Sequence, residues 1–287
     1  DPAKADTDNV RSSGNAVLHG FGGADLLYGT QSQDFFFNDT ATTEIYTFTT
    51  QSTNAAFETD VAEAGAGDDQ VFTGGSSSTE STPFDGGSGN DTLQFFYPAG
   101  LFTKEPDRAL RVAVDMASGT AEEYDSADEK AGQYWFTGFE TVVGGPLDDA
   151  LAEAGGGGDL VGGAGDDTLL GGAGDDTLRG GRGRDDLDGE AGDDLLDGGR
   201  GRDDLDGGAG ADRFAVSRGR DEIGDFDAAE GDVLALSAEL TGFAEAGAAL
   251  AALTFRDGDA VLRHAAGRVL LEDVAPGGIA AEDLLIL

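Results

Sequence analysis

Residues 162–206 read GGAGDDTLL, GGAGDDTLR, GGRGRDDLD, GEAGDDLLD and GGRGRDDLD, which are five nine-residue units joined without a gap. Each unit starts with glycine and carries aspartate in the sixth place and leucine in the eighth. The same phase extends over 144–215, where Gly158 is the one departure at the sixth place and Phe214 stands at the last eighth place. A strict period of this kind indicates a stacked repeat architecture.

Two such units make one coil, so each unit is expected to stack on the next unit but one. Places seven to nine form a short strand whose apolar eighth residue points inward. The sixth-place residues then form two ladders. The first ladder holds Asp149, Asp167, Asp185 and Asp203, and the second holds Gly158, Asp176, Asp194 and Asp212.

The repeat has the composition of a calcium site. Paired glycines reach positive φ and turn the chain tightly, so that several carbonyl oxygens point into one space, and the aspartate adds a carboxylate. Hard oxygen ligands without histidine or cysteine favour Ca²⁺ over zinc or copper. The predicted ligands are the ladder aspartates and the first glycines of the units, Gly162, Gly171, Gly180, Gly189, Gly198 and Gly207. Six stacked pairs, of which Gly158 weakens one, predict about five calcium ions.

Scattered units precede this block. Residues 20–28 and 29–37 carry Asp25 and Asp34 in the sixth place, and isolated units at 64–72 and 86–94 carry Asp69 and Asp91. These four aspartates lack a matching aspartate two unit lengths away, so we expect them to bind calcium more weakly, with the intervening segments as irregular turns of the same coil. The stretch NDTATTEIYT at 38–47 matches the translation of a common sequencing adapter, and no function is drawn from it.

The repeat is interrupted and then ends. Residues 98–143 contain strand-like runs at 111–115 and 133–143, which predict a β insert. After residue 215 the composition changes, and 221–237 and 269–274 again have strand-like patterns.

Charge and composition exclude several classes of partner. The chain has 17 Lys and Arg against 57 Asp and Glu, a formal net charge of −40, which repels nucleic acid and anionic lipid. No apolar run reaches the length of a membrane span, and no N-terminal signal peptide is visible. The absence of cysteine excludes disulfides and thiolate sites.

The pattern GGxGxDxUx is the calcium-binding unit of RTX proteins, and this chain resembles the C-terminal β-roll and secretion module of the serralysin-like family. The resemblance implies an all-β fold: an irregular N-terminal β region over 1–143, a right-handed parallel β-roll over 144–215, and a cap and secretion region over 216–287. It also implies that Asp225 and Asp232 hold a last calcium ion. Type I secretion machinery is the implied partner, with residues 259–287 as the export signal, and the implied location is extracellular.

Catalytic motifs are missing from the sequence. No HExxH motif accompanies His19 or His264, and no GxSxG elbow is present, so we expect a module without enzymatic activity. The alternative is the C-terminal part of a secreted protease, lipase or polysaccharide-modifying enzyme whose catalytic domain lies upstream. A glycan-acting face on 1–143 also stays open. The arginines Arg182, Arg184, Arg200 and Arg202 fit either charge compensation, which we favour, or contact with an acidic glycan at a cell surface.

Overall fold

The computed structural model describes residues 66–73, 84–95, 111–124, 130–153 and 155–287, together with the strands at 9–11, 16–20, 26–28, 34–38, 44–47 and 61–63. The chain divides into two compact units, Asp1–Leu147 and Asp148–Leu287. The second unit contains most of the strict repeats, and the first contains the scattered ones.

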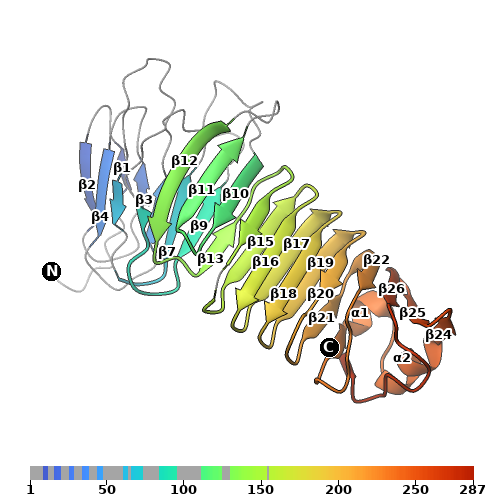
Figure 1. Ribbon diagram of the computed structural model, residues 1–287. Helices are drawn as coiled ribbons and strands as arrows, with labels where there is room; N and C mark the ends of the chain where they lie inside the picture. The colour runs from blue at the N-terminus through green and yellow to red at the C-terminus, as the bar shows by residue number, and fades with distance from the viewer. Residues whose placement is uncertain are drawn as a thin grey trace. The chain divides into compact units, whose positions relative to one another are not determined.

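Two parallel sheets form the body of the second unit, and the chain alternates between them (Figure 1). The first sheet contains β14 (Ala150–Ala152), β16 (Thr168–Ala173), β18 (Asp186–Ala191), β20 (Asp204–Asp206) and β22 (Arg218–Ile223). The second sheet contains β15 (Asp159–Ala164), β17 (Thr177–Gly183), β19 (Leu195–Gly201), β21 (Arg213–Val216) and β23 (Val233–Leu236). The predicted parallel β-roll is confirmed.

The eighth-place side chains stack in register to form the core. Leu169 pairs with Leu187 and Leu187 with Leu205, so that each step along the sheet spans two units of the repeat. In the second sheet Leu178 pairs with Leu196 and Leu196 with Phe214. These six residues, together with Leu151 and Leu160 at the start of the two rows, are at most 2 % exposed, as the inward-facing pattern predicts. Because each coil adds only two such side chains, the apolar core is a thin column.

Glycine allows successive coils to approach each other closely. Gly183, in the fourth place, has φ of 144°, and a β-carbon built on it would lie 1.7 Å from the carbonyl oxygen of Gly165 in the preceding coil. Gly181, in the second place, likewise has positive φ. The first glycine of each pair does not, so the prediction that both paired glycines reach positive φ was wrong for the first place.

The repeat continues one unit beyond residue 215, where the sequence-based interpretation ended it. Strand β22 pairs with β20, so that Ile223 stacks on Leu205 as one eighth-place residue stacks on another. Asp221 takes the sixth place of this unit, two units after Asp203. The signal was present in the sequence but hidden, because residues 216 and 217 are Val and Ser where most of the other units have two glycines.

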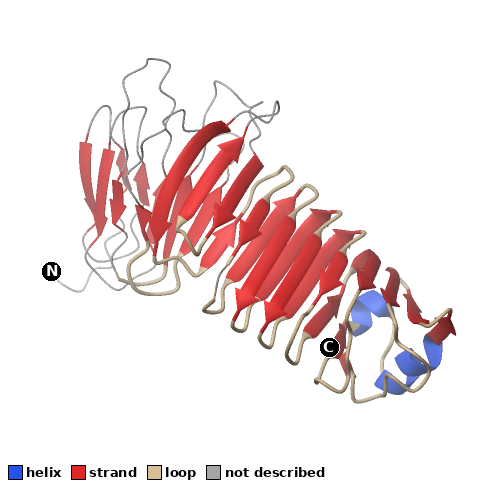
Figure 2. Ribbon diagram, viewed as in Figure 1, coloured by secondary structure: helices blue, strands red, loops and turns tan. Residues whose placement is uncertain are grey.

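A small cap closes the second unit. It contains α1 (Ala238–Thr241), α2 (Ala246–Ala252) and the antiparallel strands β24 (Leu253–Arg256), β25 (Asp259–His264) and β26 (Gly267–Leu271) (Figure 2). Strand β26 continues the first sheet beside β22, and β27 (Leu284–Ile286) continues the second beside β23. The strand predicted at 269–274 begins two residues earlier. Both helices were missed, although AGAALAA in α2 is rich in the best helix former.

In the first unit, described strands pair in parallel with uneven spacing. Leu18 pairs with Phe36, two unit lengths further on, but Leu27 pairs with Tyr46 and Val71 with Leu93. The expectation that the intervening segments turn in the same coil is confirmed for these strands. They are β1 (Asn9–Arg11), β2 (Ala16–Gly20), β3 (Leu26–Tyr28), β4 (Asp34–Asn38), β5 (Glu44–Thr47), β6 (Val61–Glu63), β7 (Asp69–Thr73), β8 (Phe84–Asp85), β9 (Thr92–Phe95) and β13 (Thr141–Val143).

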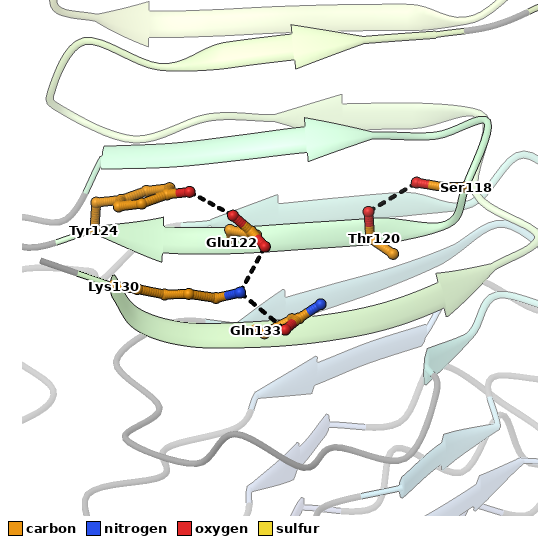
Figure 3. Close-up of polar contacts among 6 residues, drawn as sticks. All are labelled: Ser118, Thr120, Glu122, Tyr124, Lys130 and Gln133. Carbon is orange, nitrogen blue, oxygen red and sulfur yellow. Dashed lines mark hydrogen bonds and ion pairs between the residues drawn. The ribbon is translucent and has the colours of Figure 1, made fainter. Parts of the chain in front are cut away.

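The predicted β insert is an antiparallel sheet of β10 (Arg111–Asp115), β11 (Thr120–Tyr124) and β12 (Lys130–Thr137). The end of β12 returns to the coil, where it pairs in parallel with β8. Polar side chains link the insert strands: Lys130 Nζ lies 2.5 Å from Glu122 and 2.9 Å from Gln133, and the Tyr124 hydroxyl also donates to Glu122 (Figure 3). These hydrogen bonds lower the pKa of Glu122, which keeps it a charged surface group.

The leucine column gives the first prediction. Leu187 is fully buried in β18, whereas Leu170 is 36 % exposed on β16. In saturating calcium, Leu187→Ala is expected to lower the free energy of unfolding by about 2–5 kcal/mol because it leaves a cavity, and Leu170→Ala by less than about 1 kcal/mol. Urea unfolding followed by circular dichroism measures both, and equal losses would contradict the assignment of the core.

Candidate metal sites

The sixth-place aspartates form two buried rows alongside the leucine column. Asp149, Asp167, Asp176, Asp185, Asp194, Asp203 and Asp212 are at most 2 % exposed. Every one lies immediately before a strand, because the loop ends where the strand ladder begins. The structure therefore brings together the two ladders that the spacing predicts.

One oxygen of each carboxylate is fixed by the neighbouring coil. The backbone N–H of Asp167 donates to Asp185 Oδ1 at 3.0 Å, and that of Asp185 donates to Asp203 Oδ1 at 3.1 Å. The second ladder repeats this bond from Asp176 to Asp194 and from Asp194 to Asp212. From Asp167 to Asp212, each carboxylate is thus held in one orientation, with its other oxygen left over.

The other oxygen has no hydrogen-bond partner. This holds for the buried Oδ2 atoms of Asp167, Asp176, Asp185, Asp194, Asp203 and Asp212. A buried unpaired carboxylate oxygen is costly, and such oxygens are rarely left without a partner in folded proteins. A regular row of them fits a row of bound cations.

The first-place glycines provide the space beside these oxygens. A β-carbon on Gly189 would lie 2.4 Å from Asp194 Oδ2 and 2.6 Å from the carbonyl oxygen of Gly207 in the next coil. The carboxylate oxygen and the carbonyl oxygen therefore face the same small space. At Gly162, Gly171, Gly180, Gly198 and Gly207 the β-carbon would likewise collide with Oδ2 of the aspartate in the same unit, at 2.4–2.8 Å.

The donor set matches a hard cation. Among the described residues, no three acidic, histidine or cysteine side chains converge on one point, so a bound ion would need carbonyl oxygens as well as carboxylates. A mixture of carboxylate and carbonyl oxygens is what Ca²⁺ takes, at six to eight ligands. The residues present fit calcium, and their individual roles as ligands stay predictions.

Burial also shifts the proton affinity of the ladders. Desolvation raises the pKa of Asp167 and Asp203 to about 7, and that of Asp176, Asp194 and Asp212 to about 6. Neighbouring carboxylates raise these values further, while the backbone hydrogen bonds lower them. Without a cation, the folded rows therefore bind protons more tightly than exposed aspartates do.

A second aspartate row, in the fifth place of the units, lies outside the first. The fifth-place Asp166 accepts from the N–H of Arg184, and Asp175 accepts from the N–H of Asp193. These exposed side chains bond to the following coil, whereas sixth-place side chains bond to the preceding one. Each loop is therefore tied to both of its neighbours.

Gly158 interrupts the second ladder as expected. Its N–H donates to Asp176 Oδ1 at 2.6 Å, but glycine adds no carboxylate to the candidate ion site beside it.

In the first unit, Asp69 and Asp91 stack on each other. The N–H of Asp69 donates to Asp91 Oδ1 at 2.9 Å, and the N–H of Asp91 donates to Glu140 at 2.8 Å. The premise that these two aspartates lack stacked partners was wrong, because insertions lengthen the step between them beyond two unit lengths. Glu140, which takes the sixth-place position in the next coil, was not predicted from the sequence.

The predicted Asp25 lies outside the described residues, and for Asp34 only the backbone, in β4, is described.

At the end of the roll, Asp221 and Asp232 extend the two ladders. Asp221 is buried next to Asp203, with Oδ1 unpartnered, and burial raises its pKa to about 6. Asp232 Oδ1 accepts from the N–H of Asp212 at 2.9 Å, and its Oδ2 accepts from the N–H of Asp227. Asp225 accepts instead from the N–H groups of Gly207 and Gly208. The two residues of the predicted last site, Asp225 and Asp232, thus have separate backbone partners. Asp221 was not among the residues predicted from the sequence.

Comparison with known proteins agrees with this geometry. The model of the RTX calcium-binding nonapeptide repeat matches residues 12–39, 58–79, 84–94, 154–187 and 188–223. A search of curated proteins found no match. The crystal structure of the extracellular lipase LipA from Serratia marcescens is similar over 100 % of this chain and 41 % of its own, at 18 % identity and a TM-score of 0.36. The chain spans about two fifths of that lipase. The matched segments are therefore RTX calcium-binding nonapeptide repeats, and those of the second unit form the β-roll.

Proposed function

We propose that the chain is a secreted, non-catalytic module whose β-roll folds on binding extracellular calcium and supports type I export and stability. The observation that carries the proposal is the row of buried carboxylate oxygens without partners. Asp167, Asp185 and Asp203 stack as like charges in a chain with a net charge of −40, so that the ladder opposes folding unless a cation is present.

The spaces between stacked sixth-place residues suggest the number of ions. Five lie within 144–215, as the sequence predicts: three in the first ladder and two in the second. The pairs formed by Asp221 and Asp232 with the preceding aspartates add two candidate sites at the C-terminal end.

Calcium concentration then controls folding. Extracellular calcium modules have dissociation constants of roughly 0.1–1 mM. At about 1 mM free calcium and a constant of about 0.1 mM, each site contributes about 1.4 kcal/mol of stability, so that five sites contribute about 7 kcal/mol. That is comparable with the stability of a whole domain. At sub-micromolar calcium the contribution vanishes, which leaves an unfolded chain suited to passage through an exporter.

Within the described residues no helix is long and apolar enough to span a membrane. The ring nitrogens of His264 are buried without partners, and burial lowers the pKa of this histidine. No nucleophile or acid lies at hydrogen-bond distance from them among the described residues, so His264 offers no catalytic pair.

Asp185→Asn tests the calcium mechanism. Asparagine keeps the Oδ1 acceptor for the Asp167 N–H but removes the charge between two stacks. We expect the calcium concentration at the folding midpoint to rise several-fold, because two adjoining sites lose a carboxylate, a loss of about 2–3 kcal/mol at about 1 mM calcium. The control is Asp166→Asn on the exposed row. Circular dichroism during a calcium titration is the measurement; full β signal in excess chelator, or equal midpoints, would refute the mechanism.

The raised pKa values give a prediction for the calcium-free protein. The folded-state pKa values of Asp167 and Asp203, about 7, exceed the ordinary value of 3.8, so the folded chain binds more protons than the unfolded chain. In chelator, stability is therefore expected to increase as the pH falls from 8 to 5, and to be lost as the pH rises through 6–7. Calcium affinity should change in the opposite direction, because protons compete for the same oxygens.

The double variant Asp167→Asn/Asp203→Asn separates this effect from general charge repulsion. It is expected to raise stability in chelator at pH 8 and to weaken calcium binding, whereas the exposed Asp166→Asn/Asp193→Asn pair changes both much less. Circular dichroism at pH 5 and 8, with and without calcium, is the measurement. A chelator signal that is greater at pH 8 than at pH 5 would exclude the linkage.

Export is tested by deleting residues 281–287 and expressing the chain beside a type I exporter. We expect the secreted amount to fall to background, because the resemblance assigns the export address to this end. Deletion of residues 180–197 removes one whole coil in phase and should leave export intact. Undiminished export of the C-terminal deletion would rule out the assignment.

A further inference from the structure

Three successive coils carry the same charged segment on one edge of the roll. Residues 182–185, 200–203 and 218–221 all read RGRD. The sheet register places Arg182 beside Arg200 and Arg200 beside Arg218. All six arginines of these segments are exposed, and we call them the arginine edge: Arg182, Arg184, Arg200, Arg202, Arg218 and Arg220.

The row continues into the cap. Arg220 pairs in register with Arg268 of β26, which pairs in turn with Arg263 of β25. Arg268 has a buried Nε without a hydrogen-bond partner. Eight of the 17 basic residues of this strongly acidic chain therefore lie along one edge, six on adjacent strands and two, Arg184 and Arg202, in the turns that directly follow β17 and β19.

The fold itself does not require these arginines. At the opposite edge of the same coils, the third and fifth places hold Ala173 and Asp175, then Ala191 and Asp193. The coil before the arginine edge has Ala164 and Asp166 in these places. Like charges on directly neighbouring strands are destabilising, so three coils in succession keep an arrangement that costs stability.

Charge compensation accounts for only part of the edge. Within the described part of the chain, Arg202 is the one member with an ion pair, at 3.5 Å from Glu222, and its side chain is 61 % exposed. An exposed pair of this kind contributes little. Arg184 and Arg202 also lie near Asp204 and lower its pKa against the larger effect of burial. The guanidinium groups of the other four members form no ion pair in the described part of the chain and are left to solvent or to a ligand.

We propose that the arginine edge binds a linear anionic polysaccharide that runs across successive coils. Neighbouring parallel strands are about 4.8 Å apart, so the edge presents a guanidinium pair at each such step. Guanidinium forks bind carboxylates and sulfates through two parallel hydrogen bonds. The RGRD segments have no aromatic side chain on which bases would stack, which favours an acidic glycan over single-stranded nucleic acid.

Calcium makes this surface available to a polyanion. Asp185, Asp203 and Asp221 directly follow the fifth-place arginines and would be neutralised by the ions of the calcium function proposed above, on which this step rests. The seventh-place Asp204 and Glu222 stay beside the edge, where they face Arg184 and Arg202. Acidic groups further away are screened beyond about 8 Å at physiological ionic strength. We therefore expect glycan binding by the calcium-folded chain.

The test uses the full chain and labelled heparin and oligogalacturonate fragments of equal length, at a free calcium concentration fixed with an electrode. Fluorescence anisotropy measures affinity. Arg200→Gln/Arg202→Gln is expected to weaken binding by about tenfold or more. The matched control Arg179→Gln/Arg256→Gln removes two exposed arginines elsewhere and should change affinity less than about twofold. The two fragments distinguish sulfate from carboxylate as the bound group.

Circular dichroism in calcium checks that each variant folds, and it reports on the calcium mechanism separately from glycan binding. The variant Arg200→Lys/Arg202→Lys keeps both charges but loses the paired hydrogen bonds of the guanidinium groups, so it should weaken binding several-fold. It provides the test if the glutamine variant does not fold. No binding by the native, folded chain would overturn the proposal. So would equal losses in edge and control variants, unchanged affinity of the lysine variant, or tighter binding of an oligothymidylate of equal charge.

Discussion

Burial of one carboxylate in successive repeat units, directly beside a leucine column, is the constraint on which the roll depends. The column buries two large side chains per coil, and from residue 162 to residue 215 the adjoining ladders give each coil two carboxylates with an unpaired oxygen. The apolar term alone therefore works against a repulsive electrostatic term of the same periodicity. A cation in each space turns this repulsion into attraction. A bound proton removes part of the repulsion, and burial accordingly raises the pKa of Asp167 and Asp203 to about 7.

Much of this was predictable from the sequence, because the period of the repeat corresponds to the step between stacked strands of the coil. The two-unit register, the inward leucines and the buried aspartates follow from spacing alone. Asp221 was missed because Val216 and Ser217 replace the glycines that mark a unit, although Ile223 kept the phase. The stacking of Asp69 on Asp91 was missed for another reason: insertions change the spacing while the strand register is preserved. The two helices of the cap depend on packing against strands, which no local period records.

The glycines divide their roles more finely than composition suggests. Those in the second and fourth places adopt positive φ and let carbonyl groups of adjacent coils approach, whereas the first leaves room for a carboxylate oxygen. The places not constrained in this way, the third and fifth, are where the two edges of the roll differ in charge. The architecture thus separates positions that maintain the coil from positions that present a surface, so that one edge can carry arginine while the other carries aspartate.

The identical units at 180–188 and 198–206 have a consequence for how the chain finds its alignment. Shifting the pairing by one whole coil recreates nearly the same contacts, so the repeats alone do not distinguish the correct pairing from a slipped one. The sequence after Ile223 does. Its longer step from Asp212 to Asp232 and the ring contact of Phe226 with Phe214, at 6.2 Å, occur once in the described chain. The segment between β22 and β23 therefore sets the register from which the coils of the second unit are counted.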